Sequence, residues 1–337
     1  MSGDRARKVF MDQNSPLVTA VIPVYNHERY VAASISSLID QTYTEIELIV
    51  INDGSRDDSH RRTLELKERC EERFVRFIYI CRENKGLAAT LNEALELASG
   101  EFFSILASDD IALPNREELL VGALSSRDES YAAAFGDALL IDGSGERIAL
   151  DGGRKAIPFS ARSSGQIFST CFALHTAGMQ GFDYRGEQFG SYPSLLCNNY
   201  LPAMSTLVRT RCIREVGGWT DGNTVEDWEL WRKLAKRYRF VLVDQPVACY
   251  RWHESNSVKT VSDRLNLSTY ALLGNEREYC EQRGLTEKWR RAQARLLLPV
   301  LWGRRIPLRT KLELLYRSEL TQSLPYLTTE VMRRLSR

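Results

Sequence analysis

The sequence has little that would point to an exported, disulfide-bonded or nucleic-acid-binding protein. Residues 1–16 are polar and contain no apolar signal region, so we expect a chain that is not exported. The formal net charge is only +1 over 337 residues, which gives no overall reason to expect a nucleic-acid partner. The seven cysteines are widely spaced and include no Cys-x-x-Cys pair, a pattern typical of reduced cytosolic thiols.

What is present suits a folded enzyme with an α/β fold. With 43% hydrophobic residues, the chain can bury a sizeable core in one large or two smaller units. Apolar runs at residues 17–24, 46–51, 75–80 and 102–107 predict strands, and helical stripes of apolar residues follow the first and third of them. Short links between strands and helices predict a mainly parallel sheet with helices on both faces.

Polar residues follow each of these strands, and those after the fourth strand are the most informative. Asp109 and Asp110 follow the fourth strand after Ser108. Because parallel strands share one carboxyl edge, where α/β proteins bind ligands, we expect Tyr25, Asp53, Asn84 and Asp109 to lie together there. Carboxylate oxygens suit Mg2+ or Mn2+. The alternative is that the two aspartates begin a loop and cap the next helix.

Four motifs at these strand ends resemble, in order and spacing, those of family 2 glycosyltransferases with the GT-A fold. The motifs are Val21-Ile22-Pro23-Val24-Tyr25-Asn26, Ile51-Asn52-Asp53-Gly54-Ser55, Asn84-Lys85-Gly86-Leu87 and Ser108-Asp109-Asp110. The similarity covers about residues 17 to 255, and each motif alone is weak. It implies a Rossmann-like, mainly parallel sheet flanked by helices.

The resemblance and the charge pattern together divide the chain into four parts. We expect a polar N-terminal segment at 1–16 and a nucleotide-sugar-binding half at 17–136. An acceptor-binding and catalytic-base half follows at 137–260, and a basic helical C-terminal extension at 261–337.

The resemblance assigns the donor pocket to the first half. Pro23 and Tyr25 would line the pocket for the base, with the Tyr25 ring against a pyrimidine. Asp53 would accept a hydrogen bond from the uracil ring N–H, which implies a UDP-sugar donor. Asn84 and Gly86 would bring the backbone close to the nucleotide. The ordinary alternative is burial for Tyr25 and a turn for Asp53, Asn84 and Gly86.

The metal motif departs from the family pattern of Asp-x-Asp, because Ala107 stands at its first position. By resemblance, Ser108 and Asp109 would contact the donor, and Asp109 would be the direct ligand of Mn2+ or Mg2+ with Asp110 beside it. His253 resembles a histidine that completes the metal or diphosphate site in some GT-A enzymes. One or two carboxylates can suffice where substrate phosphates complete the shell. The remaining histidines have no comparable context: His27, His60 and His175.

Glu226 and Asp227 lie in the first turn of a predicted helix, where the helix dipole favours acidic residues in any case. They resemble the Glu-Asp motif of the family, whose Asp acts as the general base on the acceptor hydroxyl. Arg251 is a second candidate for neutralising the diphosphate. The resemblance thus implies an inverting transferase that acts on a saccharide or lipid-linked acceptor, in surface polysaccharide or glycoconjugate synthesis.

Two other functions stay open from the sequence. The missing aspartate at Ala107 is compatible with a catalytically inactive nucleotide-sugar-binding protein of the same fold. A nucleotidyltransferase on a similar sheet is the other alternative, although no Gly-rich phosphate loop with Arg or Lys follows the first strand.

The C-terminal part is basic, with 13 Lys or Arg against 4 Asp or Glu in residues 283–337. Its apolar run at 296–302 is far shorter than the roughly 20 residues that cross a bilayer. A basic amphipathic tail can lie on an anionic inner leaflet, which would make this cytoplasmic protein a peripheral one, or it can pack on the catalytic domain. We expect Pro299 and Pro307 to break it into short helices.

Overall fold

The computed structural model describes residues 15–161, 165–179, 181–254, 256, 262–303 and 306–317, with 326, 328 and 331. Most of the expected N-terminal segment, residues 1–14, lies outside the described residues. Contacts divide the chain into two compact units. The sheet unit comprises the described residues of Met1–Ala138, Pro202–Gly218 and Val241–Tyr250. The helical unit comprises those of Leu139–Leu201, Trp219–Phe240 and Arg251–Arg337.

The sheet unit begins as the alternation of strands and helices that the sequence predicts. Its first elements are β1 (Val18–Val24), α1 (Val31–Ile39), β2 (Ile46–Asp53), α2 (Ser59–Leu64), α3 (Lys67–Arg73), β3 (Arg76–Arg82), α4 (Leu87–Leu97) and β4 (Phe102–Ile105). The later elements are β5 (Ile111–Ala112), α5 (Arg116–Ser125), β6 (Tyr131–Ile141), η1 (Ala203–Ser205), β10 (Thr206–Arg209), α8 (Thr210–Glu215) and β11 (Arg239–Arg251). Together the strands form one sheet in the order β3-β2-β1-β4-β10-β6-β11-β5.

The N-terminal half of this sheet is parallel. Strand β1 pairs in parallel with β2 and β4, and β2 pairs in parallel with β3. Strand β10 then runs antiparallel to both β4 and β6. Strands β1 and β2 are buried almost throughout, as expected for a parallel sheet covered on both faces. The predicted α/β fold is confirmed.

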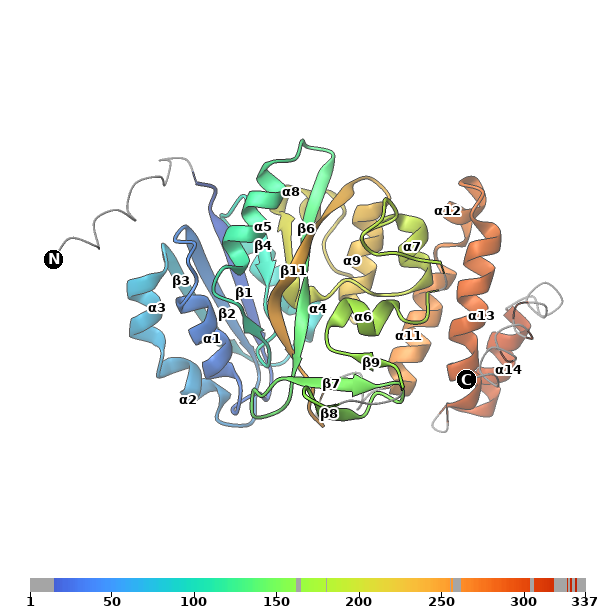
Figure 1. The fold of residues 1–337 in the computed structure, drawn as a ribbon, viewed down its shortest axis with the longest axis horizontal. Helices are drawn as coiled ribbons and strands as arrows, with labels where there is room; N and C mark the ends of the chain where they lie inside the picture. The colour runs from blue at the N-terminus through green and yellow to red at the C-terminus, as the bar shows by residue number, and fades with distance from the viewer. Residues whose placement is uncertain are drawn as a thin grey trace. The chain divides into compact units, whose positions relative to one another are not determined.

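The order of the strands reverses at β1. The chain builds outward through β2 and β3 and then returns to place β4 on the other side of β1. Right-handed crossovers put α1, α2 and α3 on one face and α4 on the other. Accordingly, α1 contacts α2 and α3, and α4 packs on β1 and β2 (Figure 1). Ligands of such sheets bind at the carboxyl ends of the strands where the order reverses, here between β1 and β4.

The helical unit holds a second, small sheet and most of the C-terminal helices. The sheet has the order β8-β7-β9 and consists of β7 (Ile148–Asp151), β8 (Ala156–Pro158) and β9 (Ile167–Phe168). The helices are α6 (Cys171–Thr176), α7 (Tyr192–Cys197), α9 (Glu226–Ala235), α11 (Ser262–Gly274), α12 (Arg277–Gln282), α13 (Thr286–Trp302) and α14 (Leu308–Arg317). Helix α13 packs against α7, α11 and α12 (Figure 1).

The expected break at Pro299 is wrong, because α13 continues through it to Trp302. A proline inside a helix loses one backbone hydrogen bond. Here Leu297, Leu298 and Val300 are buried in the core shared with α11, and this packing stabilises the last turn. Pro307 does separate α13 from α14, as expected. In the described part of the chain, no helix is long and apolar enough to span a membrane.

Candidate active site

The loops that follow β1, β2 and β4 contact one another in the sheet unit. The Nδ1 atom of His27 lies 2.7 Å from the hydroxyl of Ser108, and its Nε2 atom lies 3.7 Å from a carboxylate oxygen of Asp109. The backbone N–H of Asn26 donates to the Ser55 hydroxyl at 3.0 Å. These contacts place the polar ends of three strands at one edge, on both sides of the point where the strand order reverses.

The loop after β3 joins this edge through Asp53. One carboxylate oxygen of Asp53 accepts from the backbone N–H of Lys85 at 2.8 Å, and the other accepts from that of Gly86 at 2.9 Å. The guanidinium of Arg82 forms an ion pair with the same carboxylate. The side-chain amide of Asn84 donates to the Asp53 carbonyl at 2.8 Å. Asp53 is therefore a structural anchor of the loop whatever else it binds, and Arg82 is a partner that sequence reasoning missed.

Two glycines permit this approach of the loops. A Cβ on Gly54 would lie 2.6 Å from the backbone nitrogen of Asn84, and Gly54 also has a φ of 73°. Gly86 begins α4 with a φ of 89°. Since side chains are disfavoured in both settings, the Asp-Gly and Lys-Gly sequences are required here by local geometry.

The first strand presents the predicted base-binding residues to water. Tyr25 directly follows β1 and its side chain is about half exposed, with 47% of its surface accessible. Pro23 lies on β1 opposite Ile51 of β2 and is partly buried. An exposed aromatic ring at a strand end is available for stacking, which an ordinary core tyrosine would not be.

Asp109 is the carboxylate best placed to hold a metal. Its side chain is partly accessible beside His27, whereas Asp110 is buried and donates its backbone N–H to the Ala107 carbonyl at 3.0 Å. Among the described residues, no group of three or more His, Cys, Asp or Glu is arranged to hold a metal ion. A carboxylate beside an imidazole suits Mn2+, and substrate phosphates can complete such a shell. The residues thus fit an ion held jointly with a substrate.

His27 was predicted to be incidental, and the structure places it beside Ser108 and Asp109 instead. The available signal was its position two residues after Tyr25, at the end of a strand that leads into the expected site. His60 contacts the Tyr79 hydroxyl at 2.8 Å.

The Glu226–Asp227 pair begins α9 in the helical unit, and both side chains are partly accessible. The carboxylate of Asp227 accepts hydrogen bonds from the Asn199 side-chain amide at 3.0 Å and from the Trp228 backbone N–H at 2.6 Å. Sequence reasoning did not assign Asn199 to this pair.

The surroundings shift the pKa values of both carboxyl groups. Burial, and then the neighbouring Asp227 charge, raises the pKa of Glu226 to about 8. Burial also raises the pKa of Asp227, but the hydrogen bonds from Asn199 and Trp228 oppose that rise. Hydrogen bonds to a carboxylate favour its ionised form, so those from Asn199 and Trp228 favour the negative charge of the coupled pair on Asp227. The pair can hold one proton and one negative charge.

The rest of α9 fixes this pair in position. The indole N–H of Trp228 donates to the Leu195 carbonyl at 2.7 Å, which ties the first turn of α9 to α7. Glu229 accepts from the Thr220 hydroxyl at 2.6 Å and from the Asn223 amide at 2.7 Å, which ties the preceding loop to the helix. The start of α9 is therefore held from two sides.

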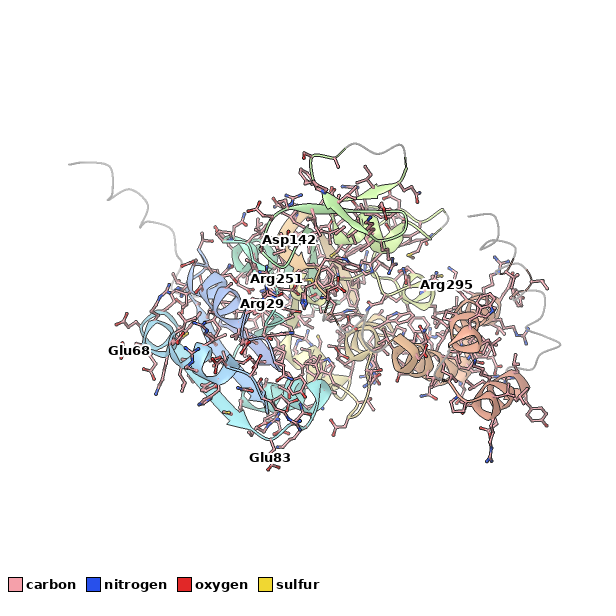
Figure 2. All side chains as sticks on the ribbon, turned by 90° about the horizontal axis from the view of Figure 1, so that it is seen from below. Arg29, Glu68, Glu83, Asp142, Arg251 and Arg295 are labelled. Atoms are coloured by element: carbon pink, nitrogen blue, oxygen red, sulfur yellow. The ribbon has the colours of Figure 1, made fainter. Side chains whose placement is uncertain are left out.

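Arg251 and His253 share a buried network at the end of β11. Arg251 donates from Nη1 to the Asp142 carbonyl at 3.0 Å, and Asp142 and Arg251 are labelled in Figure 2. The backbone N–H of His253 donates to the side chain of Asn256 at 2.6 Å, and the Asn256 amide donates to the Arg251 carbonyl at 3.0 Å. Roles for Arg251 and His253 at a diphosphate or metal stay predictions.

Comparison with known sequences points to one family. Residues 19–172 match the family model for glycosyl transferase family 2. An uncharacterised glycosyltransferase of Rickettsia felis is 28% identical over 249 residues, which make up 74% of this chain but 36% of that relative. The matched region thus spans little more than a third of the length of this curated relative.

Comparison with solved structures agrees. Residues 1–349 of TarS from S. aureus, solved with UDP-GlcNAc, align with a TM-score of 0.53 at 16% identity, covering 95% of this chain and 92% of that one. The mannosyltransferase PcManGT from Pyrobaculum calidifontis, solved with GDP-Man and Mn2+, aligns with a TM-score of 0.53 at 16% identity, covering 96% and 85%. At these identities the likeness concerns the fold, which is that of GT-A glycosyltransferases. The resemblance seen in the strand-end motifs is confirmed, since residues 19–172 match glycosyltransferase family 2.

Proposed function

We propose that this protein is an inverting glycosyltransferase that moves a sugar from a UDP-sugar to an acceptor hydroxyl. The observation that carries the proposal is the Glu226–Asp227 pair, in which the Asp227 carboxylate accepts hydrogen bonds from Asn199 and from a backbone N–H. An acceptor hydroxyl is a poor nucleophile until a positioned base takes its proton. The UDP-GlcNAc and GDP-Man of the two solved neighbours support a nucleotide sugar as the donor.

In this proposal Asp227 receives the proton of the acceptor hydroxyl. The acceptor oxygen forms a bond to the anomeric carbon while the bond from that carbon to the diphosphate oxygen breaks, and its electron pair leaves with UDP. Attack from the face opposite the nucleotide converts an α-linked donor into a β-linked product. Glu226, being protonated, keeps a second negative charge away from the base.

The donor would be held by the strand ends of the sheet unit. Tyr25 stacks on the uracil, Asp53 accepts the ring N–H, and Asn84 and Gly86 face the ribose and phosphate backbone. Asp53 can do this while it anchors the loop, because each carboxylate oxygen has more than one lone pair.

Asp109 is the residue proposed to hold a divalent ion, Mn2+ or Mg2+, and Ser108 would contact the donor beside it. Such an ion would supply positive charge to the departing diphosphate. Asp110 and His253 are proposed as further ligands, and Arg251 as a further cation for the diphosphate. The neighbour solved with Mn2+ supports the choice of metal.

Ala107 favours one second candidate, a protein that binds a nucleotide sugar without transferring it. Its position lacks the first carboxylate of the family motif, and its backbone carbonyl accepts from Ser34 and Asp110. A nucleotidyltransferase would differ from both by releasing pyrophosphate.

The deciding experiment measures products and binding together. The full chain is incubated with UDP-sugars, Mn2+ and mixed saccharide or lipid-linked acceptors, and the released nucleotide is identified. We expect UDP, and we expect Asp227→Asn to lower its formation by roughly a hundredfold or more while UDP binding is retained. Glu226→Gln is the matched control and should be milder. Binding without release would favour the binding protein, and pyrophosphate would favour the nucleotidyltransferase.

We also propose that α14 lies on an anionic membrane. Leu308, Leu312 and Tyr316 are 71%, 56% and 87% exposed and recur every four residues, so they form one apolar stripe. Leu314 and Leu315 pack against the core shared by α11 and α13, which leaves the stripe outward. The surrounding chain is basic, as an anionic surface requires.

Vesicle sedimentation tests this contact. We expect the full chain to bind vesicles that contain phosphatidylglycerol and not purely phosphatidylcholine vesicles. Leu312→Glu should reduce binding severalfold, because it places a negative charge in the apolar stripe. Leu64→Glu, at an exposed leucine of α2, is the control and should bind normally. Equal binding by all forms, or none by the wild type, would contradict the membrane role.

A further inference from the structure

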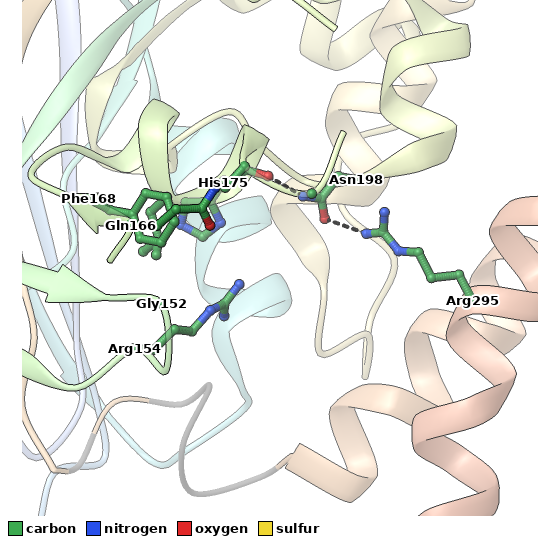
Figure 3. Close-up of a pocket in the computed structure, with 10 residues that line it drawn as sticks. Gly152, Arg154, Gln166, Phe168, His175, Asn198 and Arg295 are labelled. Carbon is green, nitrogen blue, oxygen red and sulfur yellow. Dashed lines mark hydrogen bonds between the residues drawn. The ribbon is translucent and has the colours of Figure 1, made fainter. Parts of the chain in front are cut away.

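The helical unit contains a small cavity of about 230 Å3 with a basic lining (Figure 3). Its polar side chains are Arg154, Gln166, His175, Asn198 and Arg295, which come from the β7–β8 turn, the segment before β9, α6, the end of α7 and α13. The described lining includes no aspartate or glutamate. A recess of this size is smaller than the usual pocket for a whole drug-sized ligand, so it suits one group of a larger molecule.

The two arginines reach the cavity from separate elements. Arg295 donates from Nη2 to the Asn198 side-chain oxygen at 3.1 Å, and the Asn198 amide donates to the His175 carbonyl at 2.5 Å (Figure 3). Arg154 points toward the cavity in the same view. In the part of the chain that the structure describes, no hydrogen bond or ion pair is made by its guanidinium. One cation is thus fixed by Asn198, and the other is available to a ligand.

A tight turn holds Arg154 in place. Arg154 has a φ of 63°, a conformation that residues other than glycine seldom adopt. Its backbone N–H donates to the Asp151 carbonyl at 2.8 Å. The Asp151 carboxylate accepts from the backbone N–H groups of Gly153 and Lys155, both at 2.9 Å. The turn therefore fixes the backbone from which the guanidinium extends.

The same segment carries a link to the catalytic pair. Asn198, whose side chain lines the cavity, is followed in the chain by Asn199, whose side chain binds Asp227. An occupant that orders Asn198 would also order the backbone that positions the base. This places the cavity on the acceptor side of the proposed reaction.

We propose that this cavity binds a phosphate group of the acceptor. The inference rests on the proposed function, because it concerns the acceptor of that reaction. Two guanidinium groups in a described lining that contains no carboxylate match an oxyanion, and a guanidinium can donate two hydrogen bonds to phosphate oxygens. A neutral sugar would offer no negative charge to the Arg154 guanidinium.

Binding is tested on the full chain with inorganic phosphate, glycerol 3-phosphate and glycerol as probes. Calorimetry gives the affinity, and the imidazole nitrogen resonances of His175, assigned with His175→Gln, report occupancy at this cavity. We expect both phosphates to bind and to shift the His175 signal, and glycerol to do neither. Arg154→Gln and Arg295→Gln should each weaken phosphate binding by about tenfold or more.

Matched control variants distinguish the loss of a positive charge at the cavity from the loss of a positive charge elsewhere on the protein. Lys155→Gln alters the same turn, and Arg291→Gln alters the same helix as Arg295 without touching the cavity. Both should bind phosphate within about twofold of the wild type. Arg295→Lys keeps a charge near Asn198 and should bind better than Arg295→Gln. If the controls lose binding as strongly as Arg154→Gln, the cavity assignment is overturned.

Three further results bear on the assignment. An unmoved His175 signal at high phosphate concentration would overturn the site. Displacement of phosphate by UDP would give the cavity to the donor and overturn the acceptor role. Equal rates of sugar transfer to neutral and phosphorylated acceptors would mean that a free anion occupies the cavity. This result would also overturn the acceptor role. Asp227→Asn should keep phosphate binding, so a failure of catalysis and a failure of this site are distinguishable.

Discussion

The most deeply buried described arginine of the sheet unit and that of the helical unit have opposite surroundings. Arg116, in the sheet unit, is 0% exposed, and Arg232, in the helical unit, is 1% exposed. All three nitrogens of the Arg116 guanidinium donate hydrogen bonds. Its partners are the carbonyls of Met204, Ile105 and Thr206, the hydroxyl of Ser104 and the carboxylate of Glu117.

Arg232 lacks such partners. None of its three nitrogens makes a hydrogen bond within the described residues, and its guanidinium lies 4.9 Å from the ring centre of Trp228. Burial lowers the pKa of Arg232, although the nearby Glu276 charge opposes this. Glu276 itself accepts from the Tyr192 hydroxyl at 2.7 Å and pairs with Lys236 at 2.6 Å.

Two carboxyl groups show the same contrast between the units. Asp53 in the sheet unit has both oxygens engaged by backbone N–H groups, whereas Glu226 in the helical unit has its pKa raised by burial and by Asp227. The sheet unit uses its buried polar groups to fix loops and strands. The described part of the helical unit leaves hydrogen-bonding capacity for a proton or a ligand, which fits the base and acceptor roles proposed for it.

Breaking the Arg116–Glu117 pair should have the largest effect. Arg116→Met leaves the Glu117 carboxylate buried without its counter-ion, and we expect a loss of about 3–5 kcal/mol in the free energy of unfolding, measured with urea. Arg61→Met is the control, since its ion pairs with Asp58 and Glu65 are exposed. The double variant Arg116→Met, Glu117→Met should recover much of the loss. A loss no larger than that of the control would remove the scaffold role.

Asp53→Ala should have the next largest effect, and it acts in two ways. The backbone N–H groups of Lys85 and Gly86 lose their acceptor, so we expect a loss of stability of about 1–3 kcal/mol. UDP binding should weaken by a similar amount, and the preference for UDP over GDP should fall. Calorimetry below the unfolding temperature separates the two effects, with Asp58→Ala as an exposed control. Unchanged UDP affinity would leave Asp53 with its structural role alone.

Glu226→Gln tests the pH dependence of the helical unit. The folded pKa of Glu226 is raised to about 8, against roughly 4.3 for an unfolded glutamate. The folded state therefore keeps a proton that the unfolded state releases, and the stability that this proton confers is lost as the pH rises through this interval. We expect wild-type stability to fall relative to Glu226→Gln between about pH 4.5 and 8. Partial exposure screens the effect, and parallel stability curves would contradict the shift.

Local patterns in the sequence predict the strand ends well. Because parallel strands share their carboxyl edge, the grouping of Tyr25, Asp53, Asn84 and Asp109 at that edge follows from alternation alone. The partners of the site residues do not follow. Arg82 is 29 residues from Asp53, and Asn199 is 28 residues from Asp227, with no periodic signal to connect them.

At Pro299, tertiary packing overrides the local rule that proline ends a helix. Its ring does remove a helical hydrogen bond, but the sequence carries no direct measure of how much apolar surface the flanking leucines bury against α11. The cavity lined by Arg154 and Arg295 could not be predicted from the sequence either. The two arginines are 141 residues apart in the chain, and only the folded structure brings them to one cavity.

Arg232→Met should have the smallest effect and the opposite sign from Arg116→Met. Methionine fills a similar volume and removes a buried charge that has no hydrogen-bond partner among the described residues, while Glu276 keeps Tyr192 and Lys236. The lost contact with the Trp228 ring offsets part of this gain. We expect a gain of about 1 kcal/mol or less in the free energy of unfolding, measured with urea beside Arg116→Met. A loss of the size expected for Arg116→Met would mean that Arg232 is satisfied in solution, and the contrast between the two units would then fail at its clearest point.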